Sequence, residues 1–384
     1  MKKIAIFLMV LTIFLATACT PVVEPEETEM PPDIETEVPT QEIPPDQDSF
    51  VKSNLERETS PQVSPEDLRA LAQANTAFAL SFYNHIQGED GNIIFSPISL
   101  SLALSMTMAG AESSTEEGML QALAMTLPEN DVHAAFNALL LAIEQSQKET
   151  PEEVEGSSFQ LNIANSIWGQ AGFAFKEEFL DTLARYYGAG MYKVNFQQDP
   201  EAAREAINKW VADETEDKIQ DLIPPGAIDA LTRLVLANAI YFNGSWLHPF
   251  DEADTQKAPF MTLKGEETSV DMMSLSGESF AYGSGEGYQV ISLPYLSRDF
   301  NMTLLVPDEG TFAAFEEELA SEQLMSILEN LSFERVNLKM PKFDFQKTIN
   351  ANDPLKELGM SQAFDPAESD FTGIADVEDL YISD

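Results

Sequence analysis

The sequence is organised around one long apolar run, LTRLVLANAIYFNGSWLHPF, from Leu231 to Phe250. Between Leu234 and Phe242 nearly every side chain is apolar, and β-branched and aromatic residues are common. A strand without polar alternation is typical of one covered on both faces, so the run predicts a central strand of a large sheet. Asn243-Gly244 is a turn signal and predicts the end of that strand.

Asn238 is the polar exception in the middle of this run. A buried side-chain amide without a partner costs roughly 1–3 kcal/mol. Two interpretations stay open at this point. Asn238 makes a structural hydrogen bond to a neighbouring strand, or it belongs to a polar network at a place where the sheet has to open.

Composition excludes several classes of function. The 384 residues carry a net charge of −44, which argues against a nucleic-acid partner and against electrostatic docking on anionic lipid. A single cysteine excludes an intrachain disulfide and a cysteine metal cluster. Three histidines (His85, His133 and His248) leave little material for a metal site, so we expect neither a metal nor a cofactor.

Chemical motifs of enzymes are missing from the sequence. It contains no G-x-S-x-G, no Walker loop, no H-E-x-x-H and no G-x-G-x-x-G. The glycine-rich stretch from Gly283 to Gly287 lies between expected strands and predicts a turn. His248 could serve as a base, but no nucleophile accompanies it, so we expect a packing or surface role. No catalytic residue is predicted.

The amino end has the features of a secretory signal. Residues 1–18 place two lysines before an apolar segment that is short for a membrane span. The segment LATAC ends in Cys19 and resembles a bacterial lipobox, although Leu15 stands one place further upstream than usual. We therefore expect Cys19 to be lipidated and the protein to be anchored outside the cytoplasmic membrane. An ordinary cleavable signal, with secretion, is the alternative.

Residues 19–62 predict an acidic stalk. Proline, charge and few aromatic residues leave too little apolar area to offset chain entropy. The globular body is expected from residue 63 to residue 384. Ser64, Pro65 and Glu66 there predict the start of its first helix.

The rest of the body predicts an α+β fold, with helices mainly in the first half and strands in the second. Ser96-Pro97 predicts the start of a buried helix, and further helices are indicated near 114, 128, 176, 201, 311–330 and 354. Further strands are indicated at 92–95, 159–168, 191–196, 270–273, 280–282, 288–294, 301–307 and 333–345 and at the carboxyl end.

Several motifs, in order, resemble those of the serpin family. They are NIIFSPISLSLALSMTMAGAESSTEEGM, INKWVADETEDKIQDLI, LVLANAIYFNGSWLHPF, ISLPYL, MTLLVPDEG, MPKFDF and LKELGMSQAFDPAESDFTGI. The resemblance covers residues 64 to 384. It implies a metastable fold in which a protease cleaves an exposed loop, and the loop then inserts into the main sheet and traps the acyl-enzyme.

The resemblance also implies roles for particular residues. The shutter, where the main sheet parts, is expected at Ser96, Pro97 and Ser99, with Asn165 and Asn238 on the strands above. The breach, where insertion starts, is expected at Trp246 and Lys342. A lysine is common in the family where this sequence has Asn243.

The resemblance departs from the family at the carboxyl end. Family members continue past LYISD with a histidine-bearing strand, a hinge and the reactive loop, so roughly a fifth of a usual body is expected to lie beyond residue 384. The scissile bond is thus not in this sequence, and the chain as written is not expected to inhibit a protease.

Three hypotheses of function follow. The first is a monomeric suicide inhibitor of serine or cysteine proteases, displayed outside a bacterial cell. The second is a non-inhibitory binding or scaffold lipoprotein of the same fold. The third, an unrelated solute-binding lipoprotein, would need two similar lobes, and the sequence contains no such duplication.

Overall fold

Strand β5 (Thr232–Gly244) is the apolar run of the sequence, and it lies near the middle of the main sheet. The structure is a computed structural model that describes residues 2–7, 50–51, 55–88, 91–150, 159–345, 347 and 349–383. The main sheet has the order β13-β1-β5-β3-β4-β2. The other strands of this sheet are β1 (Lys2–Phe7), β2 (Phe50–Val51), β3 (Phe159–Gln170), β4 (Met191–Val194) and β13 (Leu380–Ile382).

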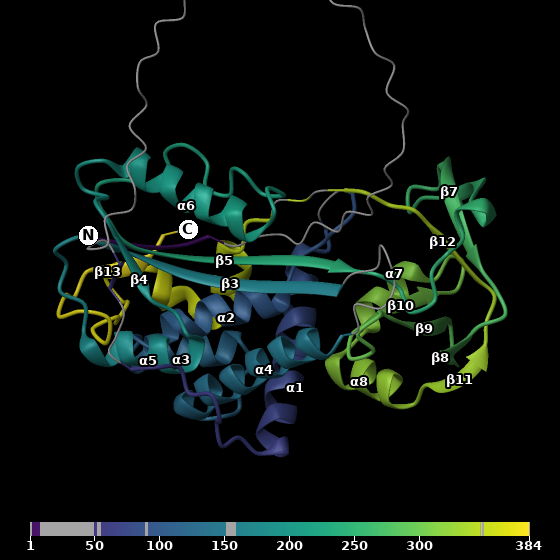
Figure 1. Cartoon of the computed structure of the whole chain (residues 1–384), viewed down its shortest axis with the longest axis horizontal. Coiled ribbons are helices and arrows are strands. Elements are labelled where there is room, and N and C mark those ends of the chain that lie inside the picture. Colours follow the sequence, from purple (N-terminus) through teal and green to yellow (C-terminus); the bar gives the residue numbers. More distant parts are fainter. Residues whose placement is uncertain are drawn as a thin grey trace, which may run out of the picture.

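The two faces of β5 are both covered, as its sequence predicts. Leu234 and Leu236 pack in the large core with the helices beneath the sheet. Val235 and Ala237 point the other way and pack under α6 (Pro200–Glu214). Figure 1 shows α6 lying alone above β5 and β3, with the helical layer on the opposite face. The absence of polar alternation is explained by this double burial.

The helical layer contains α1 to α5, and the local sequence sets where several of these helices begin. Ser64 and Asp67 form a reciprocal capping box, and Pro65 occupies the first turn of α1. Gly188 ends α5 in the left-handed conformation. The bounds are α1 (Pro65–Ile86), α2 (Pro97–Met108), α3 (Ser113–Ala122), α4 (Glu129–Glu149) and α5 (Glu177–Tyr187).

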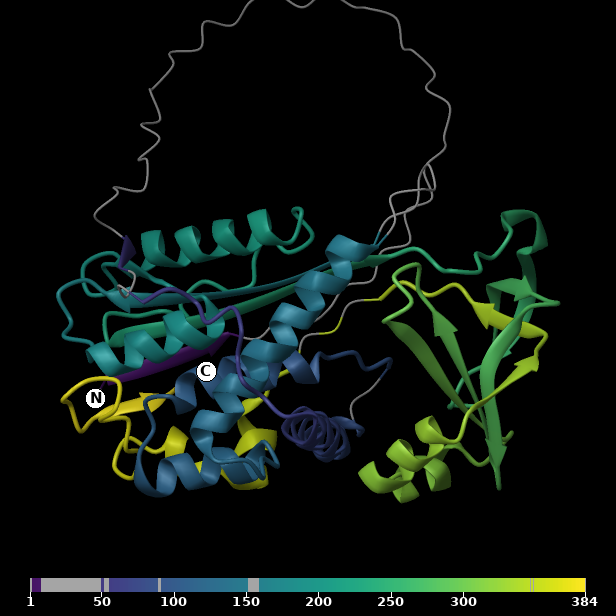
Figure 2. The same ribbon diagram turned by 60° about the horizontal axis from the view of Figure 1, so that its bottom comes forward.

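Two smaller sheets follow β5 in the chain and lie beyond one end of the main sheet (Figure 2). One has the order β10-β9-β8-β11 and the other the order β12-β7-β6. Their strands are β6 (Gln256–Met261), β7 (Glu267–Leu275), β8 (Ser279–Gly285), β9 (Tyr288–Pro294), β10 (Asn301–Pro307), β11 (Ser332–Arg335) and β12 (Leu338–Pro341). Two helices, α7 (Phe312–Glu318) and α8 (Ser321–Glu329), accompany them, and a short helix, α9 (Asn352–Leu355), follows β12.

Three predicted elements are wrong in detail. Residues 92–95 form no strand, because Ile93 and Phe95 pack into the helical core instead of joining a ladder. Residues 333–345 form no single strand, because β11 and β12 belong to different sheets and the chain turns between them. The helix predicted over 311–330 is two helices, because Leu319 has an extended backbone.

The amino end is partly placed on the body. Strand β1 lies between β5 and β13 and runs parallel to both. Strand β2 pairs antiparallel with β4, and residues 55–62 continue from there toward α1. The signal peptide over residues 1–18 stays a prediction. The stalk over 19–62 also stays one for the residues outside the described part of the chain.

Candidate functional site

Ser96, Pro97 and Ser99 form the start of α2, directly under the main sheet. Ser96 is the N-cap, and its hydroxyl accepts from the backbone N–H of Ser99 at 3.4 Å. The Ser99 hydroxyl donates to Ser96 Oγ at 2.9 Å. Pro97 fits the first turn because the N–H that proline lacks has no helical partner there. Both serines are buried, and Ser96 Oγ accepts from the backbone N–H and from the hydroxyl of Ser99.

Asn165 on β3 and Asn238 on β5 are direct partners in the antiparallel ladder. Asn238 Nδ2 donates to Asn165 Oδ1 at 2.6 Å. Asn238 has no exposed surface, and its Oδ1 has no hydrogen-bond partner among the described residues. The alternation of β5 places Asn238 on the same face as Leu234 and Leu236, toward the helical layer that contains α2. The cross-strand bond agrees with the first interpretation of Asn238, and the second, a polar network where the sheet opens, stays a prediction.

The predicted shutter thus consists of two polar pairs, one on α2 and one on the strands. Within the described residues, no hydrogen bond joins the serine pair to the asparagine pair. Two buried serines of α2 bond other side chains and not backbone carbonyls. Ser99 bonds Ser96, and Ser101 donates to Asn75 Oδ1 of α1 at 3.0 Å. These side-chain partners can be exchanged without breaking a helix.

Trp246 and Lys342, the predicted breach, line one small pocket at the end of β5. The pocket has a volume of about 40 Å³, and Tyr295 and Met340 also line it. The Trp246 ring stacks on Tyr295 with centroids 4.6 Å apart. Burial raises the pKa of the Tyr295 hydroxyl to about 12. Lys342 is held there by its backbone N–H, which donates to the carbonyl of Asp271 at 2.8 Å.

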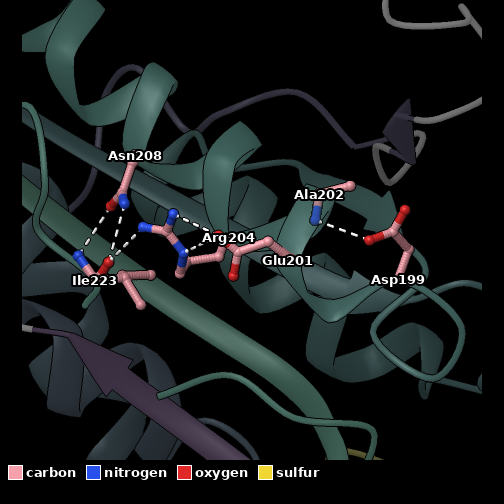
Figure 3. A network of polar contacts seen from close by, with 6 residues as sticks. All are labelled: Asp199, Glu201, Ala202, Arg204, Asn208 and Ile223. Atoms are coloured by element: carbon pink, nitrogen blue, oxygen red, sulfur yellow. Dashed lines mark hydrogen bonds and ion pairs between the residues drawn. The ribbon is translucent and has the colours of Figure 1, made fainter. Parts of the chain in front are cut away.

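A polar clasp on α6 is the part of the site that sequence reasoning missed (Figure 3). The Asn208 amide donates to the carbonyl of Ile223 at 3.0 Å and accepts from its N–H at 2.8 Å. Arg204 donates to the same carbonyl at 2.9 Å and to Glu201. The clasp ties α6 to the segment that leads into β5. The only sequence signal was the polar Asn208 between the apolar positions of an amphipathic helix.

The strand position between β5 and β13, which β1 occupies, is the remaining element of the site. These two strands run in the same direction, because β1 is parallel to each of them. Strand β1 is paired along both of its edges there, so the main sheet accommodates one additional strand at this place. The site therefore combines a strand position, two polar pairs and a helix clasped over the opposite face.

Other predicted residues lie apart from this site. His248 lies 3.3 Å from Glu278 and meets the edge of Phe280, which is a packing role. No cluster of three metal-ligating side chains occurs in the described part of the chain. None of the described helices has the length and apolar character needed to cross a bilayer. Cys19 lies outside the described residues.

Comparison with known proteins identifies the family. The profile of the family described as "Serpin (serine protease inhibitor)" matches residues 73–384. An uncharacterized serpin-like protein of Methanosarcina acetivorans is 34% identical over 324 residues, which cover 82% of this chain and 74% of that protein. The leukocyte elastase inhibitor of Sus scrofa is 35% identical over 326 residues, which cover 82% and 83%.

Solved structures give the same answer. The cleaved serpin 42Da has a TM-score of 0.72 at 28% identity and covers 80% of this chain and 81% of its own. Ovalbumin from emu also has a TM-score of 0.72, at 26% identity, with 80% and 82% covered. The fold, the order of motifs and these relatives agree, and the chain belongs to the serpin family.

Proposed function

We propose that this protein inhibits endopeptidases of the serine type, and that cysteine endopeptidases are a second class of target. The mechanism is insertion of a cleaved loop into the main sheet. The observation that carries the proposal is the strand position between β5 and β13, which already holds an added strand, β1. An inserted loop would gain backbone hydrogen bonds along both edges, which is the driving force of strand addition.

The polar pairs beside this position support the same mechanism. A sheet that has to part needs side chains whose partners can change, and Asn238 retains an acceptor with no partner in the described residues. A fully satisfied or wholly apolar centre would resist opening. No sequence position is proposed as the scissile bond, and the target protease is left to experiment.

Processing at the amino end would prepare the site. We propose that residues 1–18 are a cleaved signal and that Cys19 carries lipid, which places the inhibitor on the outer side of a bacterial membrane. Cleavage would remove β1 from the main sheet and leave the facing edges of β5 and β13 free for another strand. Labelling with radioactive fatty acid tests this step, and the label should be lost in Cys19→Ser.

Protease assays test the inhibitor proposal. The 384-residue chain and the product of its gene read past the codon for Asp384 are each incubated with trypsin, elastase, subtilisin and papain. The longer product should form a covalent complex that survives a denaturing gel, while the 384-residue chain should form none. A reading frame that ends at Asp384, or a longer product that is only degraded, would leave the non-inhibitory binding or scaffold lipoprotein as the better hypothesis.

A further inference from the structure

The segment just before α1 is fastened to the body at a place that the inhibitor mechanism does not use. Residues 55–61, here called the strap, cross α4 and the end of α5. Arg57 Nε donates to Asn137 Oδ1 at 2.9 Å, and Arg57 Nη1 lies 2.5 Å from Glu144 Oε1. Asn137 and Glu144 both belong to α4. The strap therefore reaches α4 through two hydrogen bonds from a charged guanidinium, one to an amide oxygen and one to a carboxylate.

The backbone of the strap is held as well. The Asn137 amide donates to the carbonyl of Glu58 at 2.7 Å, and the N–H of Glu58 donates to the carbonyl of Arg185 in the last turn of α5 at 2.9 Å. At Gly188, a Cβ would lie 3.0 Å from Arg57 Cδ, so glycine leaves room for the arginine stem. The strap thus bridges two helices instead of resting on one.

Asn137 is the centre of this arrangement. It has no exposed surface, and both ends of its amide are used by the strap. A buried amide that loses its partners is strongly unfavourable. The α4 surface therefore requires the strap to be in place. The strap itself is not fully satisfied, because Arg57 Nη2 is buried without a partner among the described residues. The hydrogen bonds of Asn137 therefore hold the strap on α4, while the unsatisfied Arg57 Nη2 weakens the contact and favours its release.

From α4 the contact continues to the main sheet. Gln147 lies one turn beyond Glu144, and its amide donates to the carbonyl of Leu161 at 2.8 Å and accepts from its N–H at 2.9 Å. Leu161 is in β3 and pairs with Phe242 of β5. Strand β4 pairs with β3 only at residues 167–170, so Gln147 takes the place of a strand beside Leu161.

We infer that the strap is a regulatory contact, and that its release loosens α4 and, through Gln147, the hydrogen bonding of β3 in the main sheet. Strand β2 is paired with β4 upstream of the strap, so a pull on the predicted stalk acts first on β2 and then on Arg57. The inference is independent of the inhibitor proposal, because it concerns the opening of β3 and not the fate of a protease. Coupling of this kind needs a direct measurement.

Hydrogen exchange on the whole chain measures the coupling between the strap and β3. Arg57→Ala should speed amide exchange about tenfold in residues 55–61 and by a smaller factor, about threefold, in residues 159–165, with strand β9 unchanged. Asn137→Ala, which removes the bonds to Arg57 Nε and to the Glu58 carbonyl but leaves the Arg57–Glu144 ion pair, should produce the same pattern. Arg69→Ala, at an exposed arginine of α1, is the matched control and should change none of these segments.

A double-mutant cycle separates coupling from general loosening. In the Gln147→Ala background, Arg57→Ala should still release residues 55–61 but should no longer change exchange in residues 159–165. If Arg57→Ala never affects residues 159–165, or affects them equally with and without Gln147, the proposed route through α4 is refuted. If it leaves residues 55–61 unchanged, the strap itself is refuted.

Discussion

Replacing Asn238 by leucine should stabilise the protein. The unsatisfied, fully buried Oδ1 costs about 1–3 kcal/mol, and its removal recovers that amount. The substitution loses the bond to Asn165, which is worth about 1 kcal/mol net. Burial of leucine adds about 1–2 kcal/mol, and crowding in a packed core takes back about 1 kcal/mol. The expected net gain in the free energy of unfolding is about 1 kcal/mol.

Urea unfolding followed by tryptophan fluorescence and circular dichroism measures this gain. Asn238→Ala is the informative comparison, because it also removes Oδ1 and loses the same bond but leaves a cavity where leucine would be buried, so it should be less stable than Asn238→Leu by about 1–3 kcal/mol. Asn243→Ala, at the exposed end of β5, should stay within about 0.5 kcal/mol of the wild type. If Asn238→Leu is less stable than the wild type by about 1 kcal/mol or more, Oδ1 has a partner and the reasoning fails.

Three further predictions concern other parts of the fold. A Cβ at Gly110 would lie 2.2 Å from Ile374 Cγ1, so Gly110→Ala should cost at least about 2 kcal/mol in thermal unfolding, and an unchanged midpoint would contradict the close contact. Hydrogen bonds from Thr372 are the main cause that lowers the pKa of Asp370 below its unfolded value. Because this pKa is lower in the folded state, the ionised carboxylate stabilises the folded protein at pH values above the unfolded pKa, near 3.9. That stabilisation is lost as the pH falls through the folded pKa. Asp370→Asn should therefore destabilise at pH 7, and its difference from the wild type should shrink as pH falls below about 4; a difference independent of pH would contradict this. In an absorbance titration, the tyrosinate signal that appears near pH 12 should be lost in Tyr295→Phe, whereas loss of signal near pH 10 would show that Tyr295 is not buried.

The sequence predicted those features that depend on local pattern. The unbroken apolar run of β5 correctly indicated burial on both faces, and the caps of α1 and α2 were readable from Ser64 and Ser96. Strands β9 and β10 also have the predicted bounds, because turn residues flank them closely. In each case the determining residues lie within a few positions of the element.

Features that depend on distant residues could not be predicted in the same way. Residues 92–95 have the composition of a strand, but no strand among the described residues pairs with them. Whether such a segment forms a strand depends on a partner as well as on its own residues. The Asn208–Ile223 clasp and the Gln147–Leu161 contact join residues 15 and 14 positions apart. No periodicity marks them, because an amide side chain can bind any backbone within reach. Of the predicted shutter residues, only Asn238 stood out from the sequence pattern, and Ser96, Pro97, Ser99 and Asn165 were assigned through the family resemblance.

The alternation along β3 and β5 limits how the main sheet can ever be rearranged. Asn165 and Asn238 share one face, while Val235 and Ala237 share the other. Sliding either strand by a single residue would turn the asparagine of that strand toward α6 and push its apolar side chains out of their core. Any rearrangement must therefore advance in steps of two residues, or keep β3 and β5 together and separate the sheet along the other edge of β5.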